Sequence, residues 1–188
     1  DRHAGGAVGG AACLSTVRVG RAKAGLGSLT NTHGISRAGH GIKGALERAG
    51  VEAAGVEDVY LGAAQPEGAT GMNVARNAAL WAGCPTTTSG ATINRFCSSG
   101  LQAIANAAHT VVNEGAPVTV GGGVESLSLV SHSGKMNTHR ITEEKLMAEH
   151  PAIWMAMIET AEIVAERYNV SREYQDEYSA ESQKRTAA

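Results

Sequence analysis

Short apolar segments alternate with helical patterns through the middle of the chain, and this alternation limits the possible folds more than any other feature. Strands are expected over residues 58–63, 86–94 and 117–121. Helical periodicity fills the intervals, over residues 73–82 and in the stretch that begins near residue 97. Strands separated by helices usually pair in parallel through right-handed crossovers, with helices covering the sheet. We therefore predict an α/β fold with a mixed, mostly parallel sheet and helices on both faces.

The residues before this alternating region predict one further helix and one further strand. The helix is expected over residues 36–49, with Ser36 as its N-cap and Gly50 as the residue that ends it. Residues 13–17 have the pattern of a short strand. Residues 1–12 consist mostly of small residues, so we expect a poorly ordered tail there.

Cys97 lies between an expected strand and an expected helix, in a stretch that reads ATINRFCSSGLQA over residues 91–103. The first backbone N–H groups of a helix have no partner within the helix, and their partial positive charge favours a thiolate over a thiol. Cys97 is therefore a candidate nucleophile. A free cysteine is also often a buried small apolar residue, so the position by itself leaves both interpretations open.

The helix that follows Cys97 carries two kinds of residue at helical spacing. The apolar stripe is formed by Leu101, Ile104, Ala108 and Val111. The polar stripe is formed by Gln102, Asn106, His109 and Asn113. Several alanines lie between these stripes and allow close approach to a sheet or another helix. We expect a long helix that is largely buried.

Charge and composition exclude several classes of partner. The formal net charge is -2 and like charges do not cluster, so the sequence indicates neither a nucleic acid nor an anionic membrane as a partner. No apolar run approaches the roughly 20 residues that span a bilayer, and residues 1–12 lack the pattern of a secretory signal. We expect an intracellular, cytoplasmic protein.

The cysteines and histidines do not predict a metal site. Cys13, Cys84 and Cys97 show no C-x-x-C spacing and are odd in number, which favours free thiols in a reducing compartment. The seven histidines are scattered, and none forms a ligand spacing with a cysteine or a carboxylate cluster. No metal is expected.

Residues 94–103, which read NRFCSSGLQA, closely resemble the nucleophilic-cysteine signature of the thiolases, enzymes that transfer acyl groups between coenzyme A thioesters. Three more blocks resemble thiolase segments and occur in the same order. They are GGGVES at 121–126, PEG at 66–68 followed by NVARNAAL at 73–80, and MIETAE at 157–162. Together the blocks cover roughly residues 14–188, and the chain resembles the N-terminal half of a thiolase.

The resemblance implies a thiolase-like fold and a domain organisation. Residues 13–123 would form the N-terminal core, and residues 124–188 would begin the mostly helical loop domain that is inserted after it. Within that second part, helices are expected over residues 160–169 and 171–188, the latter with Ser171 as its N-cap. The second half of a thiolase, which has a similar fold, is missing from this sequence.

The resemblance also implies the chemistry. Cys97 would accept the acyl group, while Met157 would line the tunnel for the pantetheine arm of coenzyme A unless it only packs in the core. No cofactor would be permanently bound, because coenzyme A and acyl-CoA are the substrates. An activating histidine and a second cysteine would belong to the missing half. Family members are homodimers or homotetramers, and residues 73–80 resemble their dimer contact.

Two other functions remain open from the sequence. A ketosynthase-type condensing enzyme shares the fold and a cysteine nucleophile, although the block around Glu125 fits that class poorly. The chain could also belong to a non-catalytic, thiolase-like structural or lipid-carrier subunit, or be an isolated half without activity.

Overall fold

The computed structural model describes residues 29–132, 134 and 136–187. The tail expected at 1–12 and the strand expected at 13–17 lie outside these residues. The chain divides into two compact units, residues 1–137 and 138–188, and each is considered by itself. Val124, Ser126 and Val130 are buried in the first unit, so its packing continues beyond residue 123. The loop domain expected from residue 124 onward stays a prediction.

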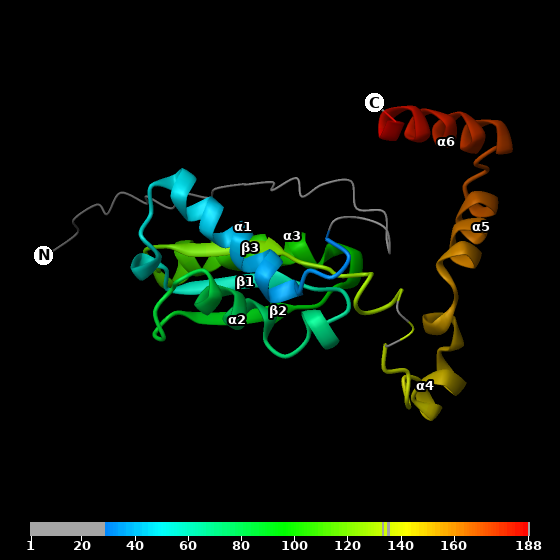
Figure 1. Ribbon diagram of the computed structural model, residues 1–188. Helices are drawn as coiled ribbons and strands as arrows, with labels where there is room; N and C mark the ends of the chain where they lie inside the picture. The colour runs from blue at the N-terminus through cyan, green and yellow to red at the C-terminus, as the bar shows by residue number, and fades with distance from the viewer. Residues whose placement is uncertain (1–28, 133, 135, 188) are drawn as a thin grey trace, which may run out of the picture. The chain divides into compact units, whose positions relative to one another are not determined.

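A three-stranded sheet forms the centre of the first unit (Figure 1). Its strands are β1 (Asp58–Gly62), β2 (Ser89–Ile93) and β3 (Thr119–Gly123), in the order β2-β1-β3. β1 pairs in parallel with both neighbours. The crossovers contain α2 (Val74–Trp81) and α3 (Ser99–His109). The α/β class and the parallel pairing predicted from the sequence are confirmed.

Helices cover both faces of the sheet. Successive side chains of β1 point to opposite faces, so their contacts show which helices lie on each face. Val59 and Leu61 pack in a cluster with residues of α2 and of α1 (Gly34–Ala49). Tyr60 points the other way, and its hydroxyl lies 2.9 Å from the hydroxyl of Thr110, just beyond α3. α1 and α2 therefore lie on one face and α3 on the other, as the sequence predicts.

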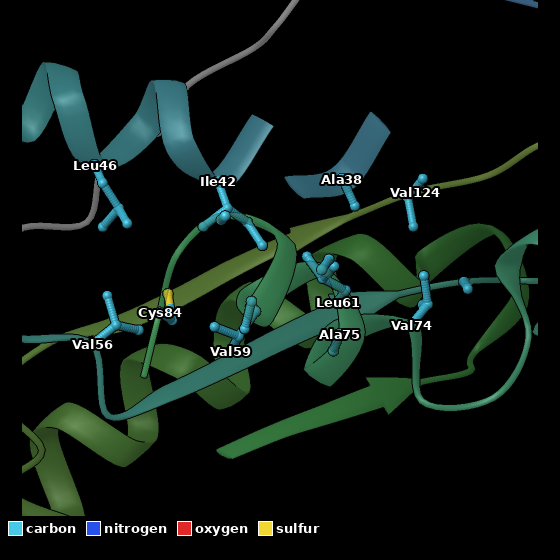
Figure 2. Close-up of a cluster of buried hydrophobic side chains, with 14 residues drawn as sticks. Ala38, Ile42, Leu46, Val56, Val59, Leu61, Val74, Ala75, Cys84 and Val124 are labelled. Carbon is cyan, nitrogen blue, oxygen red and sulfur yellow. The ribbon is translucent and has the colours of Figure 1, made fainter. Parts of the chain in front are cut away.

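The core between α1, α2 and β1 is built largely from small and branched apolar residues (Figure 2). Its α1 contribution is Ala38, Ile42 and Leu46, which lie over β1. Alanines dominate the α2 contribution, so the two helices pack closely. A Cβ on Gly39 of α1 would collide with the Trp81 ring, which explains a glycine inside this helix. Burial of this kind is the main stabilising contribution to a folded domain.

Three of these elements have bounds that differ from the expected ones by two residues or more. β3, expected over residues 117–121, spans Thr119–Gly123. α1 begins at Gly34 and not after Ser36, because the His33 Nδ1 atom accepts a hydrogen bond from the Ile35 N–H and so caps the helix. Gly50 ends α1 in the left-handed conformation, as predicted. β2 begins at Ser89 and not at residue 86, since the Thr88 N–H donates to the Pro85 carbonyl in a turn.

The helix after Cys97 differs most from its prediction. A 3₁₀ turn at Phe96–Ser98 precedes α3, and a π-helical turn at Thr110–Glu114 follows it. The buried stripe consists of Ser99, Ala103, Ala107 and Thr110. The predicted apolar stripe is wrong, since Leu101 is 73% exposed. The sheet admits only small side chains here, because a Cβ on Gly121 would lie 2.8 Å from the Ile104 Cα atom.

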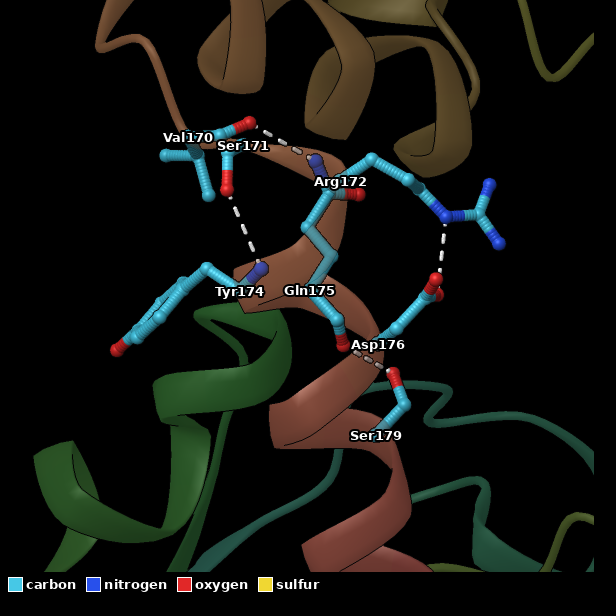
Figure 3. A network of polar contacts seen from close by, with 7 residues as sticks. All are labelled: Val170, Ser171, Arg172, Tyr174, Gln175, Asp176 and Ser179. Atoms are coloured by element: carbon cyan, nitrogen blue, oxygen red, sulfur yellow. Dashed lines mark hydrogen bonds and ion pairs between the residues drawn. The ribbon is translucent and has the colours of Figure 1, made fainter.

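The described residues of the second unit form helices joined by short turns, without a strand among them. Its helices are α4 (Glu144–Glu149), α5 (Met157–Arg167) and α6 (Arg172–Ala187). The helix expected over 160–169 starts three residues earlier than predicted. Figure 3 shows the start of α6, where the Ser171 hydroxyl accepts a hydrogen bond from the Tyr174 N–H, which confirms the predicted N-cap.

Candidate active site

Cys97 lies beyond the carboxyl end of β2, inside the 3₁₀ turn that leads into α3. Its side chain is exposed, whereas Cys84 is buried. The interpretation of Cys97 as a buried small residue is therefore wrong. In open α/β sheets, ligands bind beyond the carboxyl ends of the strands, which is where this thiol lies.

Hydrogen bonds fix the backbone on both sides of Cys97. The Asn94 Oδ1 atom accepts from the Phe96 N–H at 2.9 Å, and the Arg95 carbonyl accepts from the Ser98 N–H at 3.2 Å. Phe96 has a φ of 49°, a conformation that a residue with a side chain adopts only when its surroundings hold it there. Residues 94–96 therefore shape the turn that carries Cys97.

Arg95 connects the turn to α3. Its Nη1 atom donates to the Gln102 Oε1 atom at 2.7 Å, one turn into α3. Gln102 in turn donates from Nε2 to the Asn106 Oδ1 atom at 2.7 Å. The polar stripe of α3 therefore ties the turn to the helix surface.

Ser99 holds the turn from the first residue of α3, a contact that the sequence did not predict. It is 3% exposed, and its Oγ atom accepts from the Arg95 N–H at 2.9 Å and donates to the Phe96 carbonyl at 2.6 Å. One buried hydroxyl thus bonds the backbone of Arg95 and the backbone of Phe96, the two residues that precede Cys97. A serine in the first turn of a helix is a known signal for side-chain bonding to the backbone, and this signal could have identified Ser99.

The immediate surroundings of the thiol contain backbone groups but no base. Among the described residues, the Cys97 thiol makes no hydrogen bond and the Cys97 N–H has no acceptor. An unpaired N–H at a helix start can donate to an oxygen that gains negative charge. The arrangement therefore supplies a nucleophile and one oxyanion donor.

The carboxyl ends of β1 and β3 lie against the start of α3, next to the turn that carries Cys97. A Cβ on Gly123 would lie 3.1 Å from the Gly62 carbonyl oxygen and 3.5 Å from the Gly100 Cα atom. The Glu125 Oε2 atom accepts a hydrogen bond from the Ala64 N–H at 2.6 Å. The backbone carbonyl of Glu125 accepts one from the Arg37 Nη1 atom at 3.0 Å. Gly123 therefore lies at a close strand end, and the Glu125 carboxylate holds local backbone.

Met157, the second residue singled out by the sequence, belongs to the other compact unit. It is the first residue of α5 and its side chain is 72% exposed. Packing in a core does not explain a side chain this exposed within its unit. Its predicted contact with substrate stays a prediction.

Neither a metal site nor a membrane-spanning helix occurs in the part of the chain that the structure describes. No three histidine, cysteine, aspartate or glutamate side chains gather there as a metal-binding group. None of the described helices is long and apolar enough to cross a bilayer. His109 is the last residue of α3, ten residues from its start, so it does not approach Cys97 along that helix.

Comparison with known proteins gives consistent matches over almost the whole chain. The family model for the thiolase N-terminal domain matches residues 14–188. A 3-ketoacyl-CoA thiolase of Bacillus subtilis (strain 168) is 37% identical over 177 residues, which is 94% of this chain and 44% of the relative. A 3-ketoacyl-CoA thiolase of Vibrio vulnificus (strain YJ016) is 37% identical over 178 residues, with the same coverage.

A relative with a different name matches a shorter part of the chain. An acetyl-CoA acetyltransferase of Cupriavidus necator is 37% identical over 156 residues, covering 78% of this chain and 39% of the relative. The chain thus spans less than half the length of these curated relatives. The names of the relatives describe acyl transfer with coenzyme A thioesters in both cases.

Proposed function

The chain belongs to the thiolase family, and from this premise we propose that the protein transfers acyl groups between coenzyme A thioesters through an acyl group carried on Cys97. One observation carries the proposal. Of the two cysteines that the structure describes, the one in the family-like signature is exposed, and it lies in a hydrogen-bonded turn at the start of a helix beyond the carboxyl end of a parallel strand. The match to the thiolase model favours this reaction over that of a ketosynthase.

In the degradative direction, the Cys97 thiolate attacks the 3-keto carbonyl carbon of a 3-ketoacyl-CoA. The bond between carbons 2 and 3 breaks, and the electron pair leaves on the carbon of an acetyl-CoA carbanion, which takes up a proton. The shortened acyl chain remains on Cys97 as a thioester. The thiolate of free coenzyme A then attacks that thioester, releases the shortened acyl-CoA and restores the Cys97 thiolate.

In the biosynthetic direction, Cys97 takes an acetyl group from acetyl-CoA and releases coenzyme A. A second acetyl-CoA loses a proton from its methyl group, and the resulting carbanion attacks the acetyl thioester. The bond between the acetyl carbon and the Cys97 sulfur breaks, which gives acetoacetyl-CoA and restores the Cys97 thiolate. Each attack on a thioester or ketone passes through a tetrahedral oxyanion. We assign the Cys97 N–H as one donor to that oxyanion, since no described residue competes for it.

We assign the base and the proton donor to no described residue, because the Cys97 thiol has no hydrogen-bonded partner among them. A histidine and a second thiol from elsewhere in the whole protein would have to supply these functions. The reaction therefore needs more than the residues around the turn.

We also propose that Met157 contacts the pantetheine arm of the substrate. Its exposed thioether is unbranched and adaptable, which suits contact with a flexible chain. A Met157→Ala variant is expected to raise the KM for acyl-CoA with little change in kcat, because the contact would be made equally in the ground state and the transition state. Loss of kcat without a change in KM would contradict this role.

We expect the protein to act as a homodimer or homotetramer. β2 is an edge strand of the described sheet, and Leu80 of α2, inside the predicted dimer contact, is exposed. Light scattering of the whole protein tests the expectation. A monomer at micromolar concentration would contradict it.

The proposed reaction is tested by thiolysis kinetics of the whole protein with short and long 3-ketoacyl-CoA substrates. Cys97→Ala is expected to lower kcat by about a thousandfold or more, because the step through the acyl-enzyme disappears. Cys84→Ala is the matched control, since this buried thiol takes no part in the reaction. Retained turnover in Cys97→Ala, or absence of thiolysis in the folded wild-type protein, would overturn the proposal.

A further inference from the structure

Gly62, the last residue of β1, lies directly against the first turn of α3. A Cβ on Gly62 would collide with the carbonyl carbon of Ser99, and would lie 2.5 Å from the Gly100 nitrogen and 2.6 Å from the Ser99 oxygen. All three atoms are backbone atoms, so no side-chain rotation could relieve the collision. Only movement of the strand or of the helix start could make room.

The strand end is held on both sides. Gly62 is in register with Ile93 of β2 and with Gly123 of β3. The Gly62 carbonyl accepts a hydrogen bond from the Val124 N–H at 2.9 Å, and the Ala63 N–H donates to the Ile93 carbonyl at 3.0 Å. The central strand of the sheet therefore resists displacement, and an added methyl group at residue 62 would move the first turn of α3.

Movement of that turn would reach the nucleophile through Ser99. The Ser99 hydroxyl hydrogen-bonds to the Arg95 N–H and to the Phe96 carbonyl, in the two residues that precede Cys97. Phe96 keeps its unusual φ of 49° within this set of bonds. A shift of Ser99 would change the geometry of both hydrogen bonds and with it the conformation of the turn that carries Cys97.

We propose that Gly62 is a positioning residue for Cys97, acting through Ser99: the missing side chain lets α3 start directly on the end of β1 and so fixes the direction of the thiol. This inference rests on the proposed acyl transfer for its kinetic consequence. Its structural part stands on the contacts alone. Misplacement of a reacting group by about 1 Å can cost about a hundredfold in rate.

Gly121 of β3 provides a matched control on the same helix. A Cβ there would lie 2.8 Å from the Ile104 Cα atom and 3.0 Å from the Ala107 Cβ atom, in the middle of α3. Both glycines therefore lie at close contacts between a strand and α3. Only Gly62 contacts the turn that carries the nucleophile.

The test compares Gly62→Ala with Gly121→Ala in the whole protein. Gly62→Ala is expected to lower kcat for thiolysis between about tenfold and a hundredfold, with KM within about twofold of wild type. Gly121→Ala is expected to keep kcat and KM within about twofold of wild type, even if its urea midpoint falls as far as that of Gly62→Ala. Equal kcat losses in the two variants would overturn the proposal.

Iodoacetamide labelling gives a readout that does not depend on turnover. Peptide mapping separates Cys97, in the turn, from Cys84, which is 5% exposed and reports opening of the core. Gly62→Ala is expected to slow Cys97 labelling at least threefold without accelerating Cys84. If the wild-type protein showed no thiolysis but the Cys97 rate still changed in this way, the proposed reaction would fail and the positioning role would stand. Unchanged Cys97 labelling in folded Gly62→Ala would refute the positioning role.

Ser99→Ala tests the same connection if Gly62→Ala does not fold. Thr110→Val is its control, because the Thr110 hydroxyl is also buried and also makes two hydrogen bonds, to Tyr60 and to the Asn106 carbonyl, beyond the other end of α3. Ser99→Ala is expected to lower kcat about tenfold at constant KM, and Thr110→Val less than twofold. Equal effects of the two variants would contradict the proposal.

Discussion

The two compact units of the chain obtain their stability in different ways. Residues 29–132 of the first unit contain every buried residue that the structure describes, including Val59 and Val74 with no exposed surface. Residues 138–187 of the second unit contain helices but no buried residue among those described. The first unit is therefore stabilised by packing, whereas the helices of the second depend on interactions within each helix.

The local interactions of the second unit are individually weak. Three ion pairs among its described residues join residues four apart on one helix, and their side chains are more than half exposed: Lys145–Glu149, Arg172–Asp176 and Arg185–Glu181. Exposed pairs of this kind contribute about 0.3–0.5 kcal/mol each and weaken with salt. Figure 3 shows one of them, between Arg172 and Asp176. A helix segment held in this way opens far more easily than a packed core.

Truncation of a core side chain gives the largest expected difference between the units. Leu61→Ala in β1 removes a side chain that is 3% exposed and is expected to cost about 2–5 kcal/mol of unfolding free energy. Ile163→Ala in α5, where the side chain is 40% exposed, is expected to cost less than about 1 kcal/mol. Urea unfolding followed by circular dichroism measures both. Similar costs would show that the second unit is packed as firmly as the first.

Arg76 gives the next largest effect, because it ties α2 to the turn before β2. Its guanidinium donates to the Thr88 carbonyl at 2.6 Å and to the Thr86 carbonyl at 2.8 Å. Arg76→Met is expected to cost about 1.5–3 kcal/mol, as for hydrogen bonds from a charged donor.

The same variant should change the titration of Cys84. Burial raises the pKa of the Cys84 thiol, and the charge of Arg76 opposes part of that rise. The pKa of Cys84 is therefore expected to rise further in Arg76→Met. Alkylation of Cys84 as a function of pH measures this, and a fall in that pKa would refute the assignment of Arg76 as the opposing charge.

Helix caps provide a matched pair across the two units. The Asn73 Oδ1 atom caps α2 by accepting from the Arg76 N–H, and its Nδ2 atom donates to the Gly90 carbonyl of β2 at 2.7 Å. Asn73→Ala is expected to cost about 1–2 kcal/mol, and Ser171→Ala at α6 about 0.5 kcal/mol, the ends of the usual range for caps. Thermal unfolding of the two variants measures both losses of stability. A larger loss from Ser171→Ala would reverse the comparison.

The smallest effect is a pH dependence of α4. Backbone N–H groups of Leu146 and Lys145 donate to the Glu143 carboxylate and lower its pKa below the ordinary value. The cap therefore stabilises the helix above the pKa of the unfolded state and is lost as pH falls through the lowered pKa. Amide chemical shifts of residues 144–149 between pH 7 and pH 3 measure the loss. In Glu143→Gln the same shifts should no longer follow that titration.

The elements that the sequence predicted well are those fixed by local signals. The apolar run of β1, the glycine at residue 50 and the serine at residue 171 each determine their structure through near neighbours. The outcome for Cys97 is of the same kind, since a strand, a turn and a helix start follow one another in the chain.

The features that the sequence did not predict depend on contacts between distant residues. The buried stripe of α3 is set by Gly121 of β3, which brings the helix so close that alanine and serine face the sheet and Leu101 does not. The importance of Gly62 arises from a helix almost forty residues later in the chain. No periodicity within α3 or β1 contains that information.

Mass spectrometry of the protein after incubation with acetyl-CoA tests the central claim most directly. The whole, folded protein should carry an acetyl group on the peptide that contains Cys97, and addition of coenzyme A should remove it. Cys84 should stay unmodified, because it is buried. An unmodified Cys97 in folded protein, or equal labelling of Cys84, would contradict the assignment of Cys97 as the acyl-accepting thiol.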